Sequence, residues 1–152
     1  MDRANKKIDF IVGARPNFMK VSAILKANDG SIDARLIHTG QHFDKNMSES
    51  FFEDLKIPKP NINLDARSSS SINQISEIIK KYNDFLLESF IPDMIVVVGD
   101  VDSTLACSLV ARRHNVPLCH VEAGLRSGDM TMPEEINRIM TDSITDYFFV
   151  TS

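Results

Sequence analysis

Short apolar runs alternate along the chain with segments of helical periodicity, and this alternation restricts the folds open to it. The run at 94–98, Met-Ile-Val-Val-Val, is the most apolar, and such a β-branched run is typical of a central strand covered on both faces. Because strands separated by helices pair in parallel, the sequence predicts an α/β fold with a doubly wound, mostly parallel sheet. The other expected strands are 8–12, 35–39, 61–64, 116–121 and 146–150, and the expected helices are 16–28, one from about 44, 71–90, 102–114 and 133–145.

Composition excludes several classes of function. The chain has 152 residues with 17 basic and 21 acidic side chains, a net charge of −4, and this length suits one domain. Mild acidity without a run of Lys or Arg argues against nucleic acid or an anionic membrane as a partner. The longest apolar run, 94–98, is far shorter than the roughly 20 residues that span a bilayer, and the N-terminus lacks the pattern of a signal peptide. We therefore expect a cytoplasmic domain.

The cysteines and histidines carry weak signals. Cys107 and Cys119 lie among apolar residues of an expected helix and strand, which is typical of buried thiols in a reducing cytosol. The four histidines lack metal-ligand spacing, so no metal is expected. We expect the ring of His120 to support its neighbours, whereas His42 follows a strand and could contact a ligand.

Polar residues follow four of the expected strands, at 13–17, 39–42, 99–104 and 122–126. In open α/β sheets, ligands bind beyond the carboxyl ends of the strands. These four segments are therefore expected to line one edge of the sheet together and to form the site.

The segment 13–17, Gly-Ala-Arg-Pro-Asn, follows the first strand and opens a helix. A glycine turn, the guanidinium of Arg15 and a helix N-terminus suit an anion such as a phosphate. The alternative is a tight turn in which Arg15 forms a surface ion pair. The dinucleotide pattern G-x-G-x-x-G and the Walker loop are both absent.

Carboxylates occupy the ends of two expected strands and the start of a helix. Asp100 lies at the tip of the most apolar strand, where a poorly solvated carboxylate suits general acid or base chemistry. Glu122 follows the next strand in the same way, and its alternative role is an ion pair with Arg126. Glu134 with Thr131 matches a capping box, as does Ser71 with Gln74. Asp102 and Ser103 can cap the helix that they begin.

Five segments taken together, in this order along the chain, resemble the UDP-N-acetylglucosamine 2-epimerase family. The two strongest read His-Val-Glu-Ala-Gly-Leu-Arg-Ser-Gly-Asp at 120–129 and Pro-Glu-Glu-Ile-Asn-Arg at 133–138. The other three are Gly-Ala-Arg-Pro at 13–16 with Lys20, Thr-Gly-Gln-His at 39–42, and Gly99-Asp100 with Ser103-Thr104.

The resemblance implies a fold of two Rossmann-like domains around a cleft, the GT-B arrangement. Residues 1–152 would be the N-terminal domain, and the domain that holds most of the nucleotide would be absent, so this chain alone is expected to be inactive. The implied reaction converts UDP-GlcNAc to UDP-ManNAc by elimination and re-addition of UDP, without a cofactor. The full-length enzyme is expected to be a homodimer.

The resemblance also implies roles for individual residues. Asp100, Glu122 and Glu134 match the acidic catalytic positions of the family, although the resemblance does not say which is base and which is acid. Arg15 and Lys20 match cationic positions that contact the nucleotide sugar.

Two departures from the family pattern concern the surroundings of the site. Gln41 and His42 match positions where some members bind a second UDP-GlcNAc as activator, but residues 43–45 differ from the usual sequence, which weakens that expectation. The loop at 130–132 is shorter than in many bacterial members, so the shape of the cleft is expected to differ.

The segment 13–16 favours the branch of the family that does not hydrolyse its substrate. A hydrolysing epimerase or a related GT-B enzyme acting on nucleotide sugars is the alternative. A non-catalytic docking module is an alternative of another class.

Overall fold

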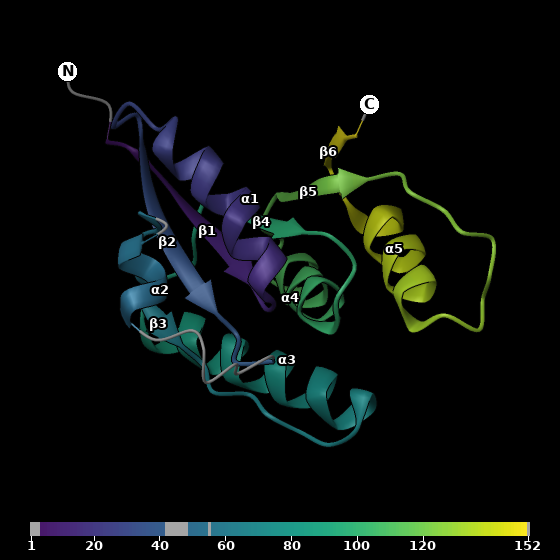
Figure 1. The fold of residues 1–152 in the computed structure, drawn as a ribbon. Helices are drawn as coiled ribbons and strands as arrows, with labels where there is room; N and C mark the ends of the chain where they lie inside the picture. The colour runs from purple at the N-terminus through teal and green to yellow at the C-terminus, as the bar shows by residue number, and fades with distance from the viewer. Residues whose placement is uncertain (1–3, 42–48, 55, 152) are drawn as a thin grey trace.

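The computed structural model describes residues 4–41, 49–54 and 56–151 and consists of a parallel sheet between two layers of helices (Figure 1). The observed elements are close to those expected from the sequence, and the start of the helix expected from about residue 44 lies outside the described residues. In chain order they are β1 (Lys6–Val12), α1 (Arg15–Lys26), β2 (Ile32–His38), α2 (Glu49–Asp54), β3 (Ile62–Asn63), α3 (Ser71–Glu88), β4 (Met94–Val98), α4 (Asp102–Arg113), β5 (Leu118–Ala123), α5 (Pro133–Ile144) and β6 (Tyr147–Val150).

The sheet has the strand order β3-β2-β1-β4-β5-β6, and every neighbouring pair is parallel. The expectation of a parallel α/β sheet is therefore confirmed. The chain adds strands outward from β1 to β3 and then returns to place β4 on the other side of β1. Such a reversal leaves a crevice at the carboxyl ends of the two central strands, where ligands bind in doubly wound folds.

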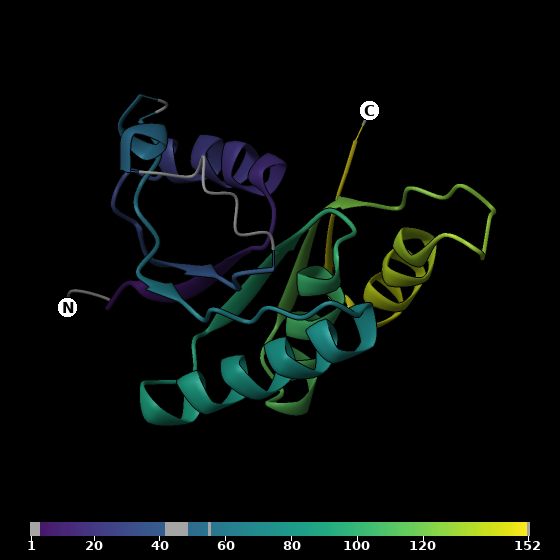
Figure 2. The same ribbon diagram turned by 60° about the horizontal axis from the view of Figure 1, so that its bottom comes forward.

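Alternate side chains of the strands fill two separate apolar cores. One face, with Ile95 and Val97 of β4, packs against α3 and α4. The opposite face, with Val96 and Val98, packs against Phe18 of α1 and against α2. Figure 2 shows α1 and α2 on one side of the sheet and α3 and α4 on the other. Burial of both faces explains why 94–98 is apolar at every position.

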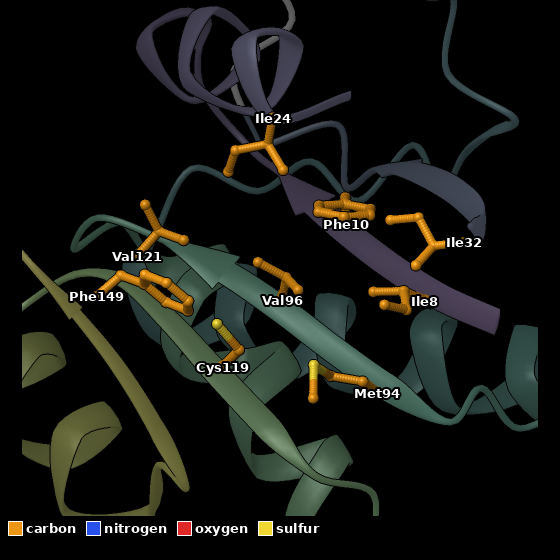
Figure 3. Close-up of a pocket in the computed structure, with 9 residues that line it drawn as sticks. All are labelled: Ile8, Phe10, Ile24, Ile32, Met94, Val96, Cys119, Val121 and Phe149. Atoms are coloured by element: carbon orange, nitrogen blue, oxygen red, sulfur yellow. The ribbon is translucent and has the colours of Figure 1, made fainter. Parts of the chain in front are cut away.

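An apolar groove remains open beside α1. Its volume is about 430 Å³. Figure 3 shows the side chains that line the groove, of which Ile24 belongs to α1 and the others to strands of the sheet. The groove offers no charged side chain, so it does not suit the anionic part of a nucleotide. Its lining residues are Ile8, Phe10, Ile24, Ile32, Met94, Val96, Cys119, Val121 and Phe149.

The expected cap of α3 is displaced by one residue. The hydroxyl of Ser70, not that of Ser71, accepts a hydrogen bond from the backbone N–H of Asn73. The amide of Gln74 instead donates to the carbonyl of Ala66 and accepts from the N–H of Ser68, so it holds the preceding loop.

Both cysteines are buried, as expected, and both are free thiols. None of the helices in the described part of the chain is long and apolar enough to cross a membrane.

Candidate active site

The turn after β1 and the start of α4 touch at the crevice. A Cβ atom added to Gly13 would lie 2.7 Å from the Cβ of Ser103, so only glycine permits this approach. The side chain of Asn17 accepts hydrogen bonds from the N–H groups of Gly13 and Ala14 at 3.3 and 3.1 Å, and its amide donates to the carbonyl of Val98 at 3.4 Å. Asn17 thereby joins the start of α1 to the end of β4.

The start of α4 is capped from outside the helix. The first residue before the helix is Val101, which offers no side-chain cap, so the expected capping by Asp102 and Ser103 is wrong. The side-chain oxygen of Gln41 instead accepts from the N–H and the hydroxyl of Ser103, at 2.9 and 2.6 Å. Gln41, an expected effector-binding residue, therefore has a structural contact here. His42 lies outside the described residues.

Asp100 is held by two residues of α5. Its carboxylate accepts a hydrogen bond from the guanidinium of Arg138 at 2.6 Å, and its carbonyl accepts one from the side-chain amide of Asn137 at 2.9 Å. The side chain of Asp100 is 34% exposed, whereas that of Arg138 is 11% exposed. The carboxylate of Asp100 is therefore partly exposed to solvent, whereas the guanidinium of Arg138 that pairs with it is mostly buried.

Glu122 occupies an irregular position in β5. The pairing of β5 with β6 shifts between Val121 and Ala123, and Glu122 has a φ of +67°, a conformation that costs a non-glycine residue of order 1–3 kcal/mol and concentrates at functional sites. The expectation that the strand ends at Val121 is therefore wrong, because the bulge allows pairing to continue through Ala123.

The carboxylate of Glu122 forms an ion pair with Lys20 of α1. Its alternative pairing with Arg126 is therefore not formed, and Arg126 contacts Asp142 instead, at 2.7 Å. A Cβ atom added to Gly99 would lie 3.6 Å from a carboxylate oxygen of Glu122. Glu122 therefore lies against the turn that carries Asp100.

Glu134 lies in the first turn of α5 and is exposed. The predicted capping box with Thr131 is wrong, because the residue before the helix is Met132 and it makes no side-chain cap. The neighbouring Glu135 is buried and accepts hydrogen bonds from the N–H and hydroxyl of Ser127. These bonds, with help from Arg138, lower the pKa of Glu135 to about 2.

Arg15 is exposed at the first residue of α1, where its guanidinium lies 5.0 Å from the centre of the Phe51 ring. Lys20 lies one turn further along the same helix. Lys20 pairs with Glu122 of β5, whereas Arg15 lies against Phe51 of α2, so the two cations of α1 have different neighbours. Within the described ranges, no group of three His, Cys, Asp or Glu residues could hold a metal ion.

The arrangement brings Asp100 and Glu122 together at the carboxyl edge of adjacent strands, each beside a cation. Neighbouring carboxylates with partial exposure can take up and release protons, and the cations can neutralise charge that develops on a leaving group. Sequence reasoning did not assign roles to Arg138, Asn137 or Asn17. A signal for Arg138 was its spacing of three residues from Glu135, because side chains at that spacing meet on a helix.

Comparison with known proteins identifies the family. The family model for UDP-N-acetylglucosamine 2-epimerase matches residues 25–152. A curated relative from Pseudomonas aeruginosa, UDP-2,3-diacetamido-2,3-dideoxy-D-glucuronate 2-epimerase, is 46% identical over 94% of this chain and 41% of its own length. UDP-N-acetylglucosamine 2-epimerase from Methanocaldococcus jannaschii is 43% identical over 94% of this chain and 39% of its own length.

A crystal structure of Methanocaldococcus jannaschii UDP-GlcNAc 2-epimerase in complex with UDP-GlcNAc and UDP matches with a TM-score of 0.88 and 43% identity. The match covers 95% of this chain and 40% of that one. The chain belongs to the UDP-N-acetylglucosamine 2-epimerase family, and its Rossmann-like sheet is that of these GT-B-type epimerases. It spans about 40% of the length of the relatives that it matches.

Proposed function

We propose that this chain is the N-terminal domain of a two-domain enzyme that inverts C2 of a UDP-linked 2-acetamido sugar, with UDP-GlcNAc as substrate and UDP-ManNAc as product. The observation that carries the proposal is the placement of Asp100 and Glu122. They meet at the carboxyl edge of β4 and β5, in a chain of this family. The missing domain supplies most of the nucleotide site, so the chain alone does not turn over substrate.

The proposed reaction needs proton transfer and charge stabilisation, and no redox cofactor. A carboxylate removes the proton from C2 while the bond from C1 to the UDP oxygen breaks, which leaves a C1=C2 double bond and free UDP. A proton then adds to C2 from the opposite face and UDP re-adds at C1. Asp100 and Glu122 serve as the base and the acid, in an order that the proposal leaves open.

The remaining site residues act around these two carboxylates. Lys20 and Arg15 bind the diphosphate and stabilise its negative charge as the bond to C1 breaks. Glu134 is the third acidic group. It precedes Arg138 by four residues, so both side chains lie on the same side of α5, and Arg138 contacts Asp100 directly.

The proposal assigns the non-hydrolysing reaction, in which UDP returns to the sugar. The segment Gly13-Ala14-Arg15-Pro16 supports it, because the resemblance associates this segment with that branch of the family. The test is incubation of the full-length protein with UDP-GlcNAc in deuterated water. We expect UDP-ManNAc carrying deuterium at C2, because the proton removed exchanges with solvent before its replacement is added.

Two other outcomes would overturn parts of this proposal. Free ManNAc with UDP would identify a hydrolysing epimerase. Binding of UDP-GlcNAc without any product or any exchange at C2 would favour a docking module.

The Pseudomonas aeruginosa relative suggests a second candidate substrate, because the name of that protein specifies UDP-2,3-diacetamido-2,3-dideoxy-D-glucuronate. Its identity of 46% is no lower than the 43% of the Methanocaldococcus jannaschii epimerase. The same assay offers this sugar beside UDP-GlcNAc at equal concentration. A kcat/KM at least about tenfold higher, equivalent to 1.4 kcal/mol of transition-state binding, would assign the uronate as substrate and leave the reaction class unchanged.

A further inference from the structure

A buried histidine and carboxylate lie directly behind the two candidate carboxylates. His120 of β5 is fully buried, and Asp142 of α5 is 8% exposed. We infer that Nε2 of His120 carries a proton and that His120, with Asp142, is a positioning residue for Asp100 and Glu122. The functional half of this inference rests on the function proposed above, whereas the protonation of the ring does not.

Both ring nitrogens of His120 face oxygen atoms. Nδ1 lies 2.6 Å from a carboxylate oxygen of Asp142, and Nε2 lies 2.7 Å from the carbonyl oxygen of Gly99. A carbonyl only accepts hydrogen bonds, so Nε2 must donate. Nδ1 and Asp142 share a second hydrogen bond, so both ring nitrogens are engaged.

The environment of Asp142 favours the ionised carboxylate. Burial opposes ionisation, but donors surround both of its oxygens and outweigh that cost. Arg126 and the N–H of Gly124 donate to one oxygen at 2.7 and 3.0 Å, and His120 contacts the other. Together they hold the pKa of Asp142 below its ordinary value. Asp142 is thus a carboxylate fixed by contacts to three other residues, and Asp142 and Arg126 are the charged groups that face His120.

This pair fixes the backbone on both sides of Glu122. Asp142 binds the ring of His120, two residues before Glu122, and the N–H of Gly124, two residues after it. The bulge that gives Glu122 its φ of +67° lies between these two anchors. A single carboxylate thus holds the strained segment that directs Glu122 toward Lys20.

The same ring also fixes the turn that carries Asp100. The hydrogen bond from Nε2 ends on the carbonyl of Gly99, the residue before Asp100, and Gly99 itself has a φ of +74°. His120 therefore sets the distance between the end of β4 and the bulge of β5. Loss of either member of the pair is expected to displace both carboxylates.

The first test measures the 15N shifts of the histidine rings by NMR, using the 152-residue chain of 17.1 kDa. We expect the Nε2 shift of His120 to be that of a protonated nitrogen, because this atom donates to the carbonyl of Gly99. An unprotonated Nε2 would overturn the inference, and this outcome depends neither on a variant nor on enzymatic activity.

The second test compares Asp142→Asn with Asp146→Asn in the full-length enzyme. Asp146 is the matched control, because it binds the N–H of Leu118 at the start of β5 and also pairs with Arg112, away from the bulge. We expect Asp142→Asn to lower kcat by about 10- to 100-fold through displacement of the reacting groups, with little change in KM. We expect Asp146→Asn to retain kcat.

A kcat of Asp142→Asn equal to that of the unmodified enzyme would overturn the positioning role. An equal loss in both variants would also overturn it, because the effect would then reflect general packing of α5 on β5. If the unmodified full-length protein has no epimerase activity, the proposed function fails while the NMR result still decides the state of His120.

Discussion

At the scale of single residues, the site combines partly exposed carboxylates with a buried layer that fixes them. Asp100 and Glu122 reach solvent and each contacts one cation. Behind them, Asn137, His120 and Asp142 bind backbone atoms of the same segments. This division suits catalysis, because reactive groups must change charge while their supports remain in place.

His38, at the end of β2, allows a prediction about stability and pH. Among the residues that the structure describes, its Nε2 has no hydrogen-bond partner, and the residue is 5% exposed with its ring beside Phe18. Burial, with a smaller contribution from the charge of Arg67, lowers the pKa of His38 to about 4, from about 6.5 in an unfolded chain. Between these values the unfolded chain binds more protons than the folded one, so acidification destabilises the fold.

We expect His38 to reduce the free energy of unfolding by on the order of 2 kcal/mol between pH 7 and about pH 4. The measurement is urea unfolding of the unmodified chain and of His38→Gln across this pH range. The variant should lose less stability, because glutamine does not titrate while the other groups remain. Parallel losses in the two proteins would show that His38 does not carry this dependence.

At the scale of elements, the limits of β4 could be predicted from the sequence alone. The apolar run 94–98 coincides with the observed strand Met94–Val98, because a strand buried on both faces needs an apolar residue at every position. The end of β5 could not be predicted in this way. Its bulge at Glu122 is held by Asp142, which lies twenty residues further along the chain and is invisible to a local pattern.

The helix caps show the same limit. For α3, α4 and α5, residues suited to capping occur close to each start, yet none of the expected caps forms at its expected residue. At α4 the first turn is satisfied by Gln41, from a distant segment after β2. Local pattern places the beginning of a helix within a residue or two, whereas the tertiary structure decides which side chain satisfies its N–H groups.

The turn after β2 yields a prediction with a matched control. Gly40 and Gly30 have similar φ values of +86° and +89°, but a Cβ atom on Gly40 would lie 2.8 Å from the Cα of Asp65. A Cβ atom on Gly30 would meet nothing within 4 Å in the described part of the chain. Both alanine variants carry the strain of a positive φ. Only Gly40→Ala adds a clash with backbone.

We expect Gly40→Ala to lose about 1–3 kcal/mol more of its free energy of unfolding than Gly30→Ala, the usual cost of overpacking. Chemical denaturation of the two variants checks this difference. Equal losses would mean that the segment around Asp65 moves aside without cost.

At the scale of the whole molecule, the order of the strands brings the site together. The candidate residues come from α1, the turn after β4, the bulge of β5 and the first turns of α5, which are separated by more than 100 residues at the extremes. The parallel sheet places the ends of its strands at one edge, and the reversal between β1 and β4 opens the crevice there. The sequence predicted this meeting of segments, while the pairing of each carboxylate with its own cation required the structure.

The central claim is that Asp100 and Glu122 transfer the proton at C2. The most direct measurement is the rate of deuterium uptake at C2 of UDP-GlcNAc in the presence of the full-length Asp100→Asn and Glu122→Gln variants. The control variant is Glu88→Gln, because Glu88 is exposed at the end of α3. The account predicts that each site variant loses about 10²- to 10⁴-fold in this rate, the usual contribution of a general acid or base, while the control is unchanged. Uptake at the rate of the unmodified enzyme in both site variants would contradict it.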